Sequence, residues 1–440
     1  MKIVITVCLA VLAGPGFAEA QGELPAPLTL TLDEAVVRGL AASHRVAEAS
    51  ARHEAAEAQV DTRRAAALPQ VAALGGYSRT NHVDTFGILL PNNQLRVIYP
   101  DIPDNVRTRV DAQWPLYTGG RLEALTDAAR REATAGAEDV AALQSDLTLE
   151  IGRAFWSLVV ANETVRVVDE SLARTGAHLE DVRHQLTAGL VSPSDVLTVQ
   201  AQQSRQRMLS IQARSSRNVA EAELARLVGA SPGTAIRPDA VLEPSATDST
   251  FTTLVSQALE QRRDRRALVS RLSGAESRVA AAAAGRRPTI ALAGGVDYAR
   301  PNVRIFPRQD AWRASWDAGV SVSWPLFDGG RSRAETAEAS ATRRAIQARM
   351  DEFDSVLALE IRQRLAEIEA SRAAIDAAAD AVTAATEARR VVGERFAAGV
   401  ATSTDVLDAQ ILVLQANLDR MQALANARLA DARLRRAIGR

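Results

Sequence analysis

The chain has 440 residues, a formal net charge of −1 and 24% charged residues. This length predicts more than one structural domain. The balanced charge excludes the basic surface that nucleic-acid binding requires, so we expect no nucleic-acid partner. The single cysteine is Cys8, and the chain beyond it therefore carries neither disulfides nor thiol chemistry.

Residues 1–20 are typical of a secretory signal peptide. Lys2 supplies the positive start, the segment from Ile3 to Ala13 is apolar, and Ala18-Glu19-Ala20 is a small-residue cleavage site. We expect the mature chain to begin near Gln21. Beyond this segment no apolar run is long enough to cross a bilayer as a helix, which leaves a soluble exported protein or a membrane β-barrel.

The first β-structure is predicted between residues 71 and 114. The residues from Val106 to Trp114 alternate between apolar and polar and end in an aromatic, which is typical of a strand with one apolar face. A weaker strand runs from Val71 to Arg79. Together they predict a β-hairpin with a long loop of residues 80–105.

The stretch WPLYTGGR, which begins at Trp114, predicts a joint between strand and helix. We expect the strand to end at Trp114 and Pro115 to close the ladder, because proline has no N–H to donate. Gly119 and Gly120 then let the backbone turn. The joint therefore leads directly into the next element.

A helix rich in Ala, Leu, Arg and Glu is predicted from Arg121 to Thr187, a stretch without proline. Its apolar residues alternate steps of four and three, the spacing of helices packed side by side in a coiled coil. This seam contains Leu143, Leu147, Ile151, Ala154, Leu158, Ala161, Val165, Val168 and Leu172.

The segment from Thr187 to Asp195 interrupts the helical pattern. Gly189 is suited to a left-handed helix stop, and Ser192, Pro193 and Asp195 form the start of another helix with a capping box. Two interpretations remain open here. The segment is either a well-capped helical hairpin and nothing more, or a turn that also contacts a partner.

The whole pattern recurs in the second half of the chain, 219 residues later for the first strand and 210 residues later from the second strand onward. Strands are predicted from Ile290 to Tyr298 and from Trp316 to Trp324, the joint recurs as Trp324, Pro325, Gly329 and Gly330, and the turn recurs with Gly399, Thr402 and Asp405. We therefore predict two tandem repeats, residues 21–229 and 252–440, with a linker or equatorial segment at 230–251. Membrane barrels need about eight strands or more, so if these four strands lie in lipid, several chains must share one barrel.

These residues resemble the TolC family of outer-membrane efflux proteins. The similarity covers nearly the whole mature chain, from LTLDEAV through both WPL joints to the turns AGLVSPSDVL and AGVATSTDVL. It implies an α+β membrane protein with a long α-helical coiled-coil barrel and a β-barrel shared between chains, four strands per chain. It also implies a homotrimer in outer-membrane lipid, with a helical tube in the periplasm.

The resemblance further implies the channel of a tripartite efflux or type I secretion system. Such a channel passes solutes to the exterior from a periplasmic adaptor protein, which connects it to an inner-membrane transporter. The family meets its adaptor through a Val-Gly-Leu-like motif, from which both alanines and Val400 depart here. The matching residues are Ala188, Gly189, Leu190, Ala398, Gly399 and Val400.

The alternative is a soluble periplasmic coiled-coil scaffold without channel activity, against which the duplicated Trp-ended strands argue. We expect no enzyme, no cofactor and no metal site, because H-E-x-x-H, G-x-S-x-G and phosphate-loop patterns are missing from the sequence. The five histidines lack paired metal spacing: His44, His53, His82, His178 and His184. The sequence does not specify the exported solute, since a wide conduit suits drugs, metal ions or polypeptides alike.

Overall fold

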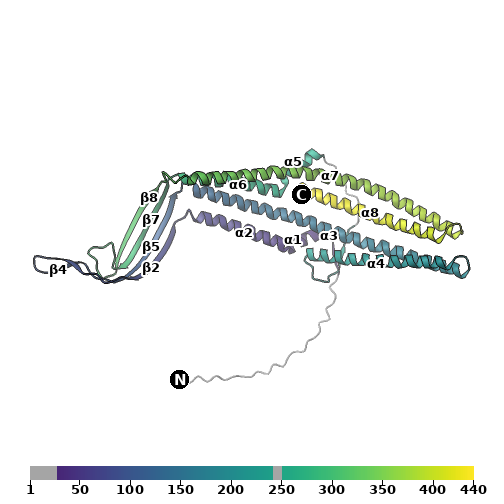
Figure 1. The fold of residues 1–440 in the computed structure, drawn as a ribbon, viewed down its shortest axis with the longest axis horizontal. Helices are drawn as coiled ribbons and strands as arrows, with labels where there is room; N and C mark the ends of the chain where they lie inside the picture. The colour runs from purple at the N-terminus through teal and green to yellow at the C-terminus, as the bar shows by residue number, and fades with distance from the viewer. Residues whose placement is uncertain (1–26, 241–249) are drawn as a thin grey trace, which may run out of the picture. The chain divides into compact units, whose positions relative to one another are not determined.

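The computed structural model describes residues 27–240 and 250–440 (Figure 1). The predicted signal peptide and part of the predicted linker lie outside these residues. The chain forms two compact units. Of the described residues, the sheet unit comprises 43–153, 250–386 and 419–440, and the tip unit comprises 27–42, 154–240 and 387–418.

The order of the main elements is the same in both halves. The first half contains α1 (Leu32–Ala42), α2 (His44–Ala65), β2 (Gln70–Arg79), β5 (Asp104–Tyr117), α3 (Arg121–Thr187) and α4 (Pro193–Leu227). The second contains α5 (Phe251–Gln261), α6 (Arg263–Ala283), the 3-10 turn Ala284–Arg286, β7 (Thr289–Arg300), β8 (Arg313–Ser323), α7 (Arg331–Ala397) and α8 (Ser403–Ala437). Helix α3 has the predicted bounds, and α7 has the same length of 67 residues. None of the helices described is both long and apolar enough to cross a membrane.

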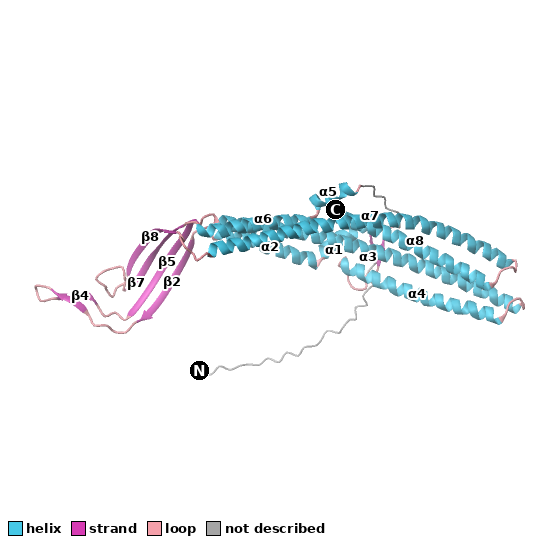
Figure 2. Cartoon of the chain, turned by 45° about the horizontal axis from the view of Figure 1, so that its top comes forward, coloured by secondary structure: helices cyan, strands magenta, loops and turns pink. Residues whose placement is uncertain are grey.

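Strands β2, β5, β7 and β8 form one antiparallel sheet in that order (Figure 2). Both predicted hairpins are present. The two halves of the chain meet where β5 pairs with β7, and there Val110 lies opposite Val296. Among the residues that the structure describes, β2 and β8 are the edges of this sheet.

The predicted end of the first strand at Trp114 is wrong. Strand β5 continues to Tyr117, and Pro115 lies inside it, paired with Ala291 of β7. The ladder between β5 and β2 already stops at Gln113. Pro115 therefore has one strand neighbour instead of two, and a missing N–H is tolerated at such a position.

The loop between β2 and β5 contains a hairpin that the sequence analysis did not predict. Its strands β3 (Phe86–Leu89) and β4 (Leu95–Tyr99) pair antiparallel, and Asn93 in the turn has a φ of 57°. We call this hairpin the ribbon. It extends beyond the end of the four-stranded sheet (Figure 1). The equivalent loop between β7 and β8 forms turns and bends instead.

The core of the sheet unit lies between α5, α7 and α8, around Leu254, Leu357 and Ile361. At its edge the buried Arg262 connects three helices. Its guanidinium donates to Asp264 at 2.9 Å, to Glu360 at 2.9 Å and to the carbonyl of Ala437 at 3.2 Å. A buried charge is stable only when paired in this way, so Arg262 holds the end of α8 in place.

The tip unit has a core around Leu179, Val182, Val199 and Leu407, where the two long helical hairpins pack together. It also contains a small parallel pair of strands, β1 (Leu28–Leu30) and β6 (Ile236–Pro238). This pair joins the N-terminal part of the chain to the segment after α4, which lies within the predicted linker or equatorial segment.

Candidate functional site

The four-stranded sheet has two unlike faces. Residues paired across antiparallel strands share a face, so the observed register gathers apolar side chains on one side. This apolar face is open to solvent in the single chain, and Trp316 is 75% exposed. Its exposed members are Val71, Tyr77, Val110, Trp114, Leu292, Val296, Tyr298, Trp316, Val320 and Val322. An apolar surface of this extent marks contact with lipid or with another protein.

Aromatic side chains lie toward both ends of the apolar face. Tyr77, Tyr298 and Trp316 are near the loops, whereas Trp114 is near the helices. Phe327, just after β8, is also exposed at the helical end. Aliphatic residues between two rims of aromatics are typical of a membrane-embedded β-sheet.

The opposite, polar face carries a network of ion pairs. Arg109 of β5 donates to both carboxylate oxygens of Asp317 of β8, at 2.9 and 3.2 Å, and also contacts Asp111 and Asp297. Its side chain crosses β7 at Gly295, where a Cβ would lie 2.7 Å from the guanidinium. The network fastens three strands to one another. The sequence pattern did not predict this network, because alternation assigns a residue to a face but does not identify the neighbouring strand.

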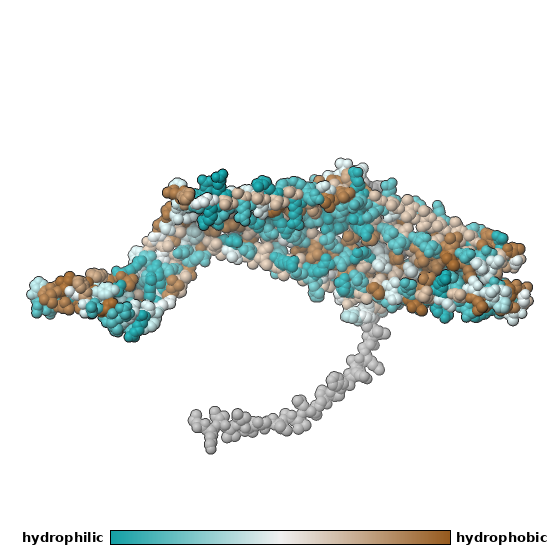
Figure 3. Space-filling view, in the orientation of Figure 1, coloured by the Kyte–Doolittle hydropathy of each residue, from teal (hydrophilic) through white to brown (hydrophobic). Residues whose placement is uncertain are grey.

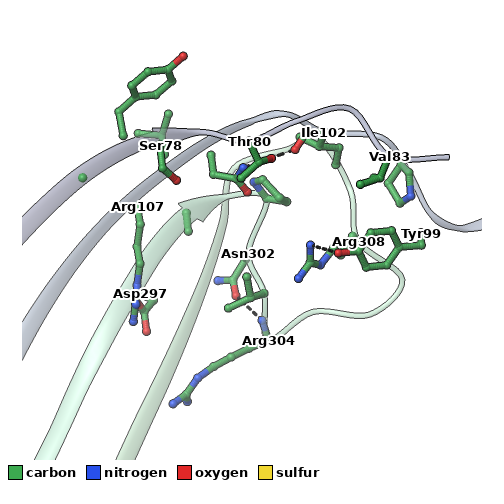
Figure 4. Close-up of a pocket in the computed structure, with 18 of the residues that line it drawn as sticks. Ser78, Thr80, Val83, Tyr99, Ile102, Arg107, Asp297, Asn302, Arg304 and Arg308 are labelled. Carbon is green, nitrogen blue, oxygen red and sulfur yellow. Dashed lines mark hydrogen bonds and ion pairs between the residues drawn. The ribbon is translucent and has the colours of Figure 1, made fainter. Parts of the chain in front are cut away.

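A pocket of about 550 Å³ lies on the polar face at the loop end of the sheet (Figure 4). Ser78, Arg107 and Asp297 of the polar face line it together with residues of both loops. Across it, Arg308 donates to the Tyr99 hydroxyl at 2.8 Å, and its guanidinium carbon lies 4.7 Å from the ring centroid. This contact joins the loop of the first half to that of the second.

The two strand–helix joints have the same backbone conformation. The φ angles of Gly119, Gly120, Gly329 and Gly330 are 67°, 86°, 67° and 87°, a region that side chains with a Cβ rarely adopt. In the second joint Pro325 lies just beyond β8.

Each joint is held by its tryptophan. The indole N–H of Trp114 donates to the carbonyl of Ala67 at 3.2 Å, and that of Trp324 donates to the carbonyl of Arg286 at 3.3 Å. Both acceptors precede the first strand of the same hairpin. The duplicated tryptophan therefore ties the end of one strand to the start of its neighbour in both halves.

The surroundings of the two joints differ. A Cβ on Gly119 would lie 2.7 Å from the Cβ of Arg287, whose guanidinium donates to the Gly119 carbonyl at 2.8 Å. A Cβ on Gly329 would meet nothing within 4 Å. The first joint is therefore packed against Arg287, which lies just before β7, and the second joint has an empty place at the same position.

Asp328 stabilises the second joint by capping α7. Its carboxylate accepts the Ser332 hydroxyl, the Ser332 N–H at 2.9 Å and the Gly330 N–H at 3.0 Å. These hydrogen bonds, chiefly those from Ser332, lower the pKa of Asp328 to about 2.

Both predicted helix turns are Schellman motifs. The N–H groups of Gly189 and Leu190 donate to carbonyls of the last helical turn at 2.9 Å each, and those of Gly399 and Val400 do so at 3.0 and 2.9 Å. The glycines have φ angles of 74° and 71°. Such a turn usually covers its apolar residue on the helix, but here Leu190 is 75% and Val400 63% exposed.

The six predicted contact residues all lie in the tip unit and are exposed there. The helices that follow both turns begin with capping boxes. The carboxylate of Asp195 accepts from the N–H and hydroxyl of Ser192 at 2.9 and 2.8 Å, and that of Asp405 accepts from Thr402 at 2.7 and 2.8 Å. The hydrogen bond from the Thr402 N–H is the main cause of a lowered pKa of Asp405.

His178 connects the two helical hairpins behind the turns, which the sequence analysis did not predict. Its Nε2 lies 2.9 Å from the Ser403 hydroxyl, and its ring centroid lies 5.1 Å from that of Phe396. Burial lowers the pKa of His178. In residues 27–240 and 250–440 no group of three or more His, Cys, Asp or Glu side chains is arranged to hold a metal ion.

A duplicated helical chain that carries paired hairpins with an exposed, aromatic-rimmed apolar face is typical of an outer-membrane channel protein. The family model described as outer membrane efflux protein matches residues 36–230 and 254–440, so the chain belongs to this family. The description of this family is one of transport across the outer membrane, not of a catalysed reaction.

The chain is similar to curated members of this class along most of its length. It is 26% identical to the outer membrane protein TolC of Vibrio cholerae over 396 residues, which cover 89% of this chain and 86% of that protein. It is 24% identical to the cobalt-zinc-cadmium resistance protein CzcC of Cupriavidus metallidurans over 358 residues, 80% of this chain and 82% of that protein.

Solved structures share the fold. The outer membrane protein VceC from Vibrio cholerae superimposes with a TM-score of 0.78 at 20% identity, covering 93% of this chain and 96% of that chain. The CmeC outer membrane channel of Campylobacter jejuni superimposes with a TM-score of 0.78 at 16% identity, covering 93% of this chain and 85% of that chain.

Proposed function

We propose that three copies of this chain form one outer-membrane channel, to which each copy contributes β2, β5, β7 and β8 as part of a shared β-barrel. Solutes reach it from an inner-membrane transporter through a periplasmic adaptor, and the long helices form the periplasmic tube. Residues 21–229 and 252–440 are its two repeats, joined by 230–251, and residues 1–20 are its signal peptide.

The observation that carries this proposal is a four-stranded sheet with two free edges and an exposed apolar face. In lipid every backbone N–H and C=O must be paired, so free edges are not tolerated there. Edges exposed in water invite uncontrolled association. When further copies close the sheet into a barrel, the backbone groups of both edge strands are paired. The apolar face then lies toward lipid, and the polar face with Arg109 lies toward the channel interior.

The duplication also supports a specific pairing between copies. Within the chain, β5 of the first repeat pairs with β7 of the second. The equivalent strands are β8 and β2, so β8 of one copy pairs with β2 of the next in the same register. Val320 then faces Tyr77 of the neighbouring copy, as Val110 faces Val296. Leu68 is equivalent to Arg287, and Leu68 of the neighbouring copy fills the empty place beside Gly329.

The exposed Leu190 and Val400 support an adaptor contact at the two turns. Backbone and capping hydrogen bonds hold both turns in place without these two side chains. The fold of the turns therefore gives no reason for apolar residues at these exposed positions. A helix-tip interface would cover them. This proposal gives the contact residues as Ala188, Gly189, Leu190, Ala398, Gly399 and Val400.

Charges at the two turns test the adaptor contact. The double variant Leu190→Glu with Val400→Glu should abolish efflux and adaptor cross-linking while oligomer yield stays unchanged, because a charge buried in an interface without a partner costs several kcal/mol. Gly189 and Gly399 are avoided, since any side chain strains their backbone.

Val303→Glu, a similarly exposed apolar residue in the loop between β7 and β8, is the matched control and should leave efflux intact. Efflux and cross-linking that persist with both turns charged would show that the adaptor binds elsewhere.

A further inference from the structure

We propose that the ribbon, strands β3 and β4 of the first loop, packs against the ribbons of neighbouring copies and forms an apolar collar at the loop end of the channel. This inference rests on the oligomer of the proposed function. It concerns a surface that the shared barrel does not need, since the second repeat has no such ribbon in its equivalent loop.

The ribbon exposes apolar side chains that the described part of the chain leaves largely uncovered. Its large apolar residues are between 39% and 64% exposed, and the space-filling view shows them gathered over this hairpin (Figure 3). They are Phe86, Ile88, Leu89, Leu95, Val97 and Tyr99. An isolated two-stranded hairpin is only marginally stable in water, so this one requires a partner surface.

The apolar residues lie on both faces of the ribbon. The pairing places Ile88 beside Arg96 on one face, and Leu89 beside Leu95 on the other. A hairpin that lies on a single surface needs only one apolar face. Each copy in a closed ring has two neighbours, one on either side, and a ribbon that is apolar on both sides fits this position.

The turn of the ribbon argues against insertion into lipid. It contains Asn92, Asn93 and Gln94, and the N–H of Gln94 donates to the Asn92 side chain at 3.3 Å. Burying such polar groups in hydrocarbon costs several kcal/mol. Arg96 in the middle of one face adds to this cost. A protein neighbour is therefore favoured over a bilayer.

The base of the ribbon is held in the right place for this contact. Tyr99 is bound to Arg308, and His82 lies 2.7 Å from Asp101. The pocket beneath these loops is lined by polar-face residues such as Ser78 and Asp297. The two loops therefore cover the face that lines the channel interior. Ribbons anchored on that side of neighbouring copies meet one another over the channel mouth.

Spin labels test the collar on the assembled channel. A nitroxide on Leu89→Cys should be immobile, and its spectrum should show dipolar broadening that is lost when labelled chains are mixed into oligomers with an excess of unlabelled ones. The same label on Ile88→Cys, on the opposite face of the ribbon, should also be immobile and broadened, because each face of the ribbon contacts a neighbouring copy. Phe306→Cys, an exposed apolar residue of the other loop, is the control and should show no broadening.

A mobile label at Leu89 would overturn the collar, because the ribbon would then stand free in water. An immobile, unbroadened label that is relaxed by oxygen but not by a water-soluble paramagnetic reagent would overturn it in favour of lipid. Native mass spectrometry of the same samples separates the two proposals. Absence of an oligomer in the unmodified protein contradicts the proposed function, whereas an intact oligomer with an unbroadened label contradicts the collar alone.

Discussion

Gly229 and Gly439 close the two repeats at equivalent positions. Both have a positive φ, and a Cβ on them would lie 2.5 Å from the Cβ of Ala42 and 2.7 Å from the backbone of Gln261 respectively. Each glycine therefore lets the last residues of a repeat contact the junction between the first two helices of the same repeat. The sequence showed both glycines, but only the structure identifies what they approach.

Gly229→Ala should lower the free energy of unfolding by about 1–3 kcal/mol, because it adds both backbone strain and a close contact. Gly393→Ala is the matched control near the C-terminal end of α7, where a Cβ would meet nothing within 4 Å. The control should be stabilising by about 0.5–1 kcal/mol. Thermal unfolding of both variants in detergent measures the difference, and equal melting temperatures would remove any packing role for Gly229.

Asp328 gives a pH-dependent contribution to the second joint. Its folded-state pKa is about 2, below the ordinary value of 3.8. The stabilisation is therefore complete above about pH 4 and is lost as the pH falls toward 2. Asp328→Asn should be less stable than the unchanged protein at pH 6, and this difference should disappear near pH 2. A constant difference across that range would mean that the charge of Asp328 is irrelevant.

At the level of elements, the strand–helix joints depend on glycine conformation. Replacing Gly119 and Gly120, or Gly329 and Gly330, with valine should reduce the yield of assembled protein, because β-branched residues adopt positive φ poorly. Gly319→Val, inside β8 with free space around it, is the control and should assemble normally. Semi-quantitative gels of membrane fractions measure the yield of assembled protein in each variant. Normal assembly of both double variants would show that the joints need no positive φ.

Element types and most bounds followed from local patterns. The bounds of α3 were predictable because Gly120 precedes it and Gly189 follows it, and its spacing is helical throughout. The end of β5 was not predictable from the sequence, because a proline at position 115 is tolerated only if the neighbouring strand β2 stops before it. The ribbon escaped prediction because its strands are short and lie among loop residues such as Pro91 and Pro100.

Contacts between distant elements were not predictable from the sequence. The network around Arg109 requires β5 to lie beside β7, and no local pattern encodes that order. Arg262 and His178 are likewise defined by partners from other helices. The turns at Gly189 and Gly399 were predictable as turns, and their exposed Leu190 and Val400 became visible only once their burial was known.

For the molecule as a whole, the duplication provides the central argument. Each repeat contributes one hairpin, and in the proposed oligomer the contact between hairpins inside the chain is the template for the contact between chains. Gly119 is packed and Gly329 has empty surroundings, which is the difference that the proposed pairing explains by a neighbouring strand present in the first case and absent in the second. On the proposed shared barrel, the fold of one chain is therefore completed by its neighbouring copies.

The pairing of β8 with β2 of the next copy is the most direct test of this account. The double variant Tyr77→Cys with Val320→Cys, oxidised in the outer membrane, should give covalent dimers and trimers on non-reducing denaturing gels. Ser78→Cys with Val320→Cys places the thiols on opposite faces of the sheet and should remain monomeric. A Tyr77→Cys, Val320→Cys protein that stays monomeric in the membrane fraction would contradict the shared barrel.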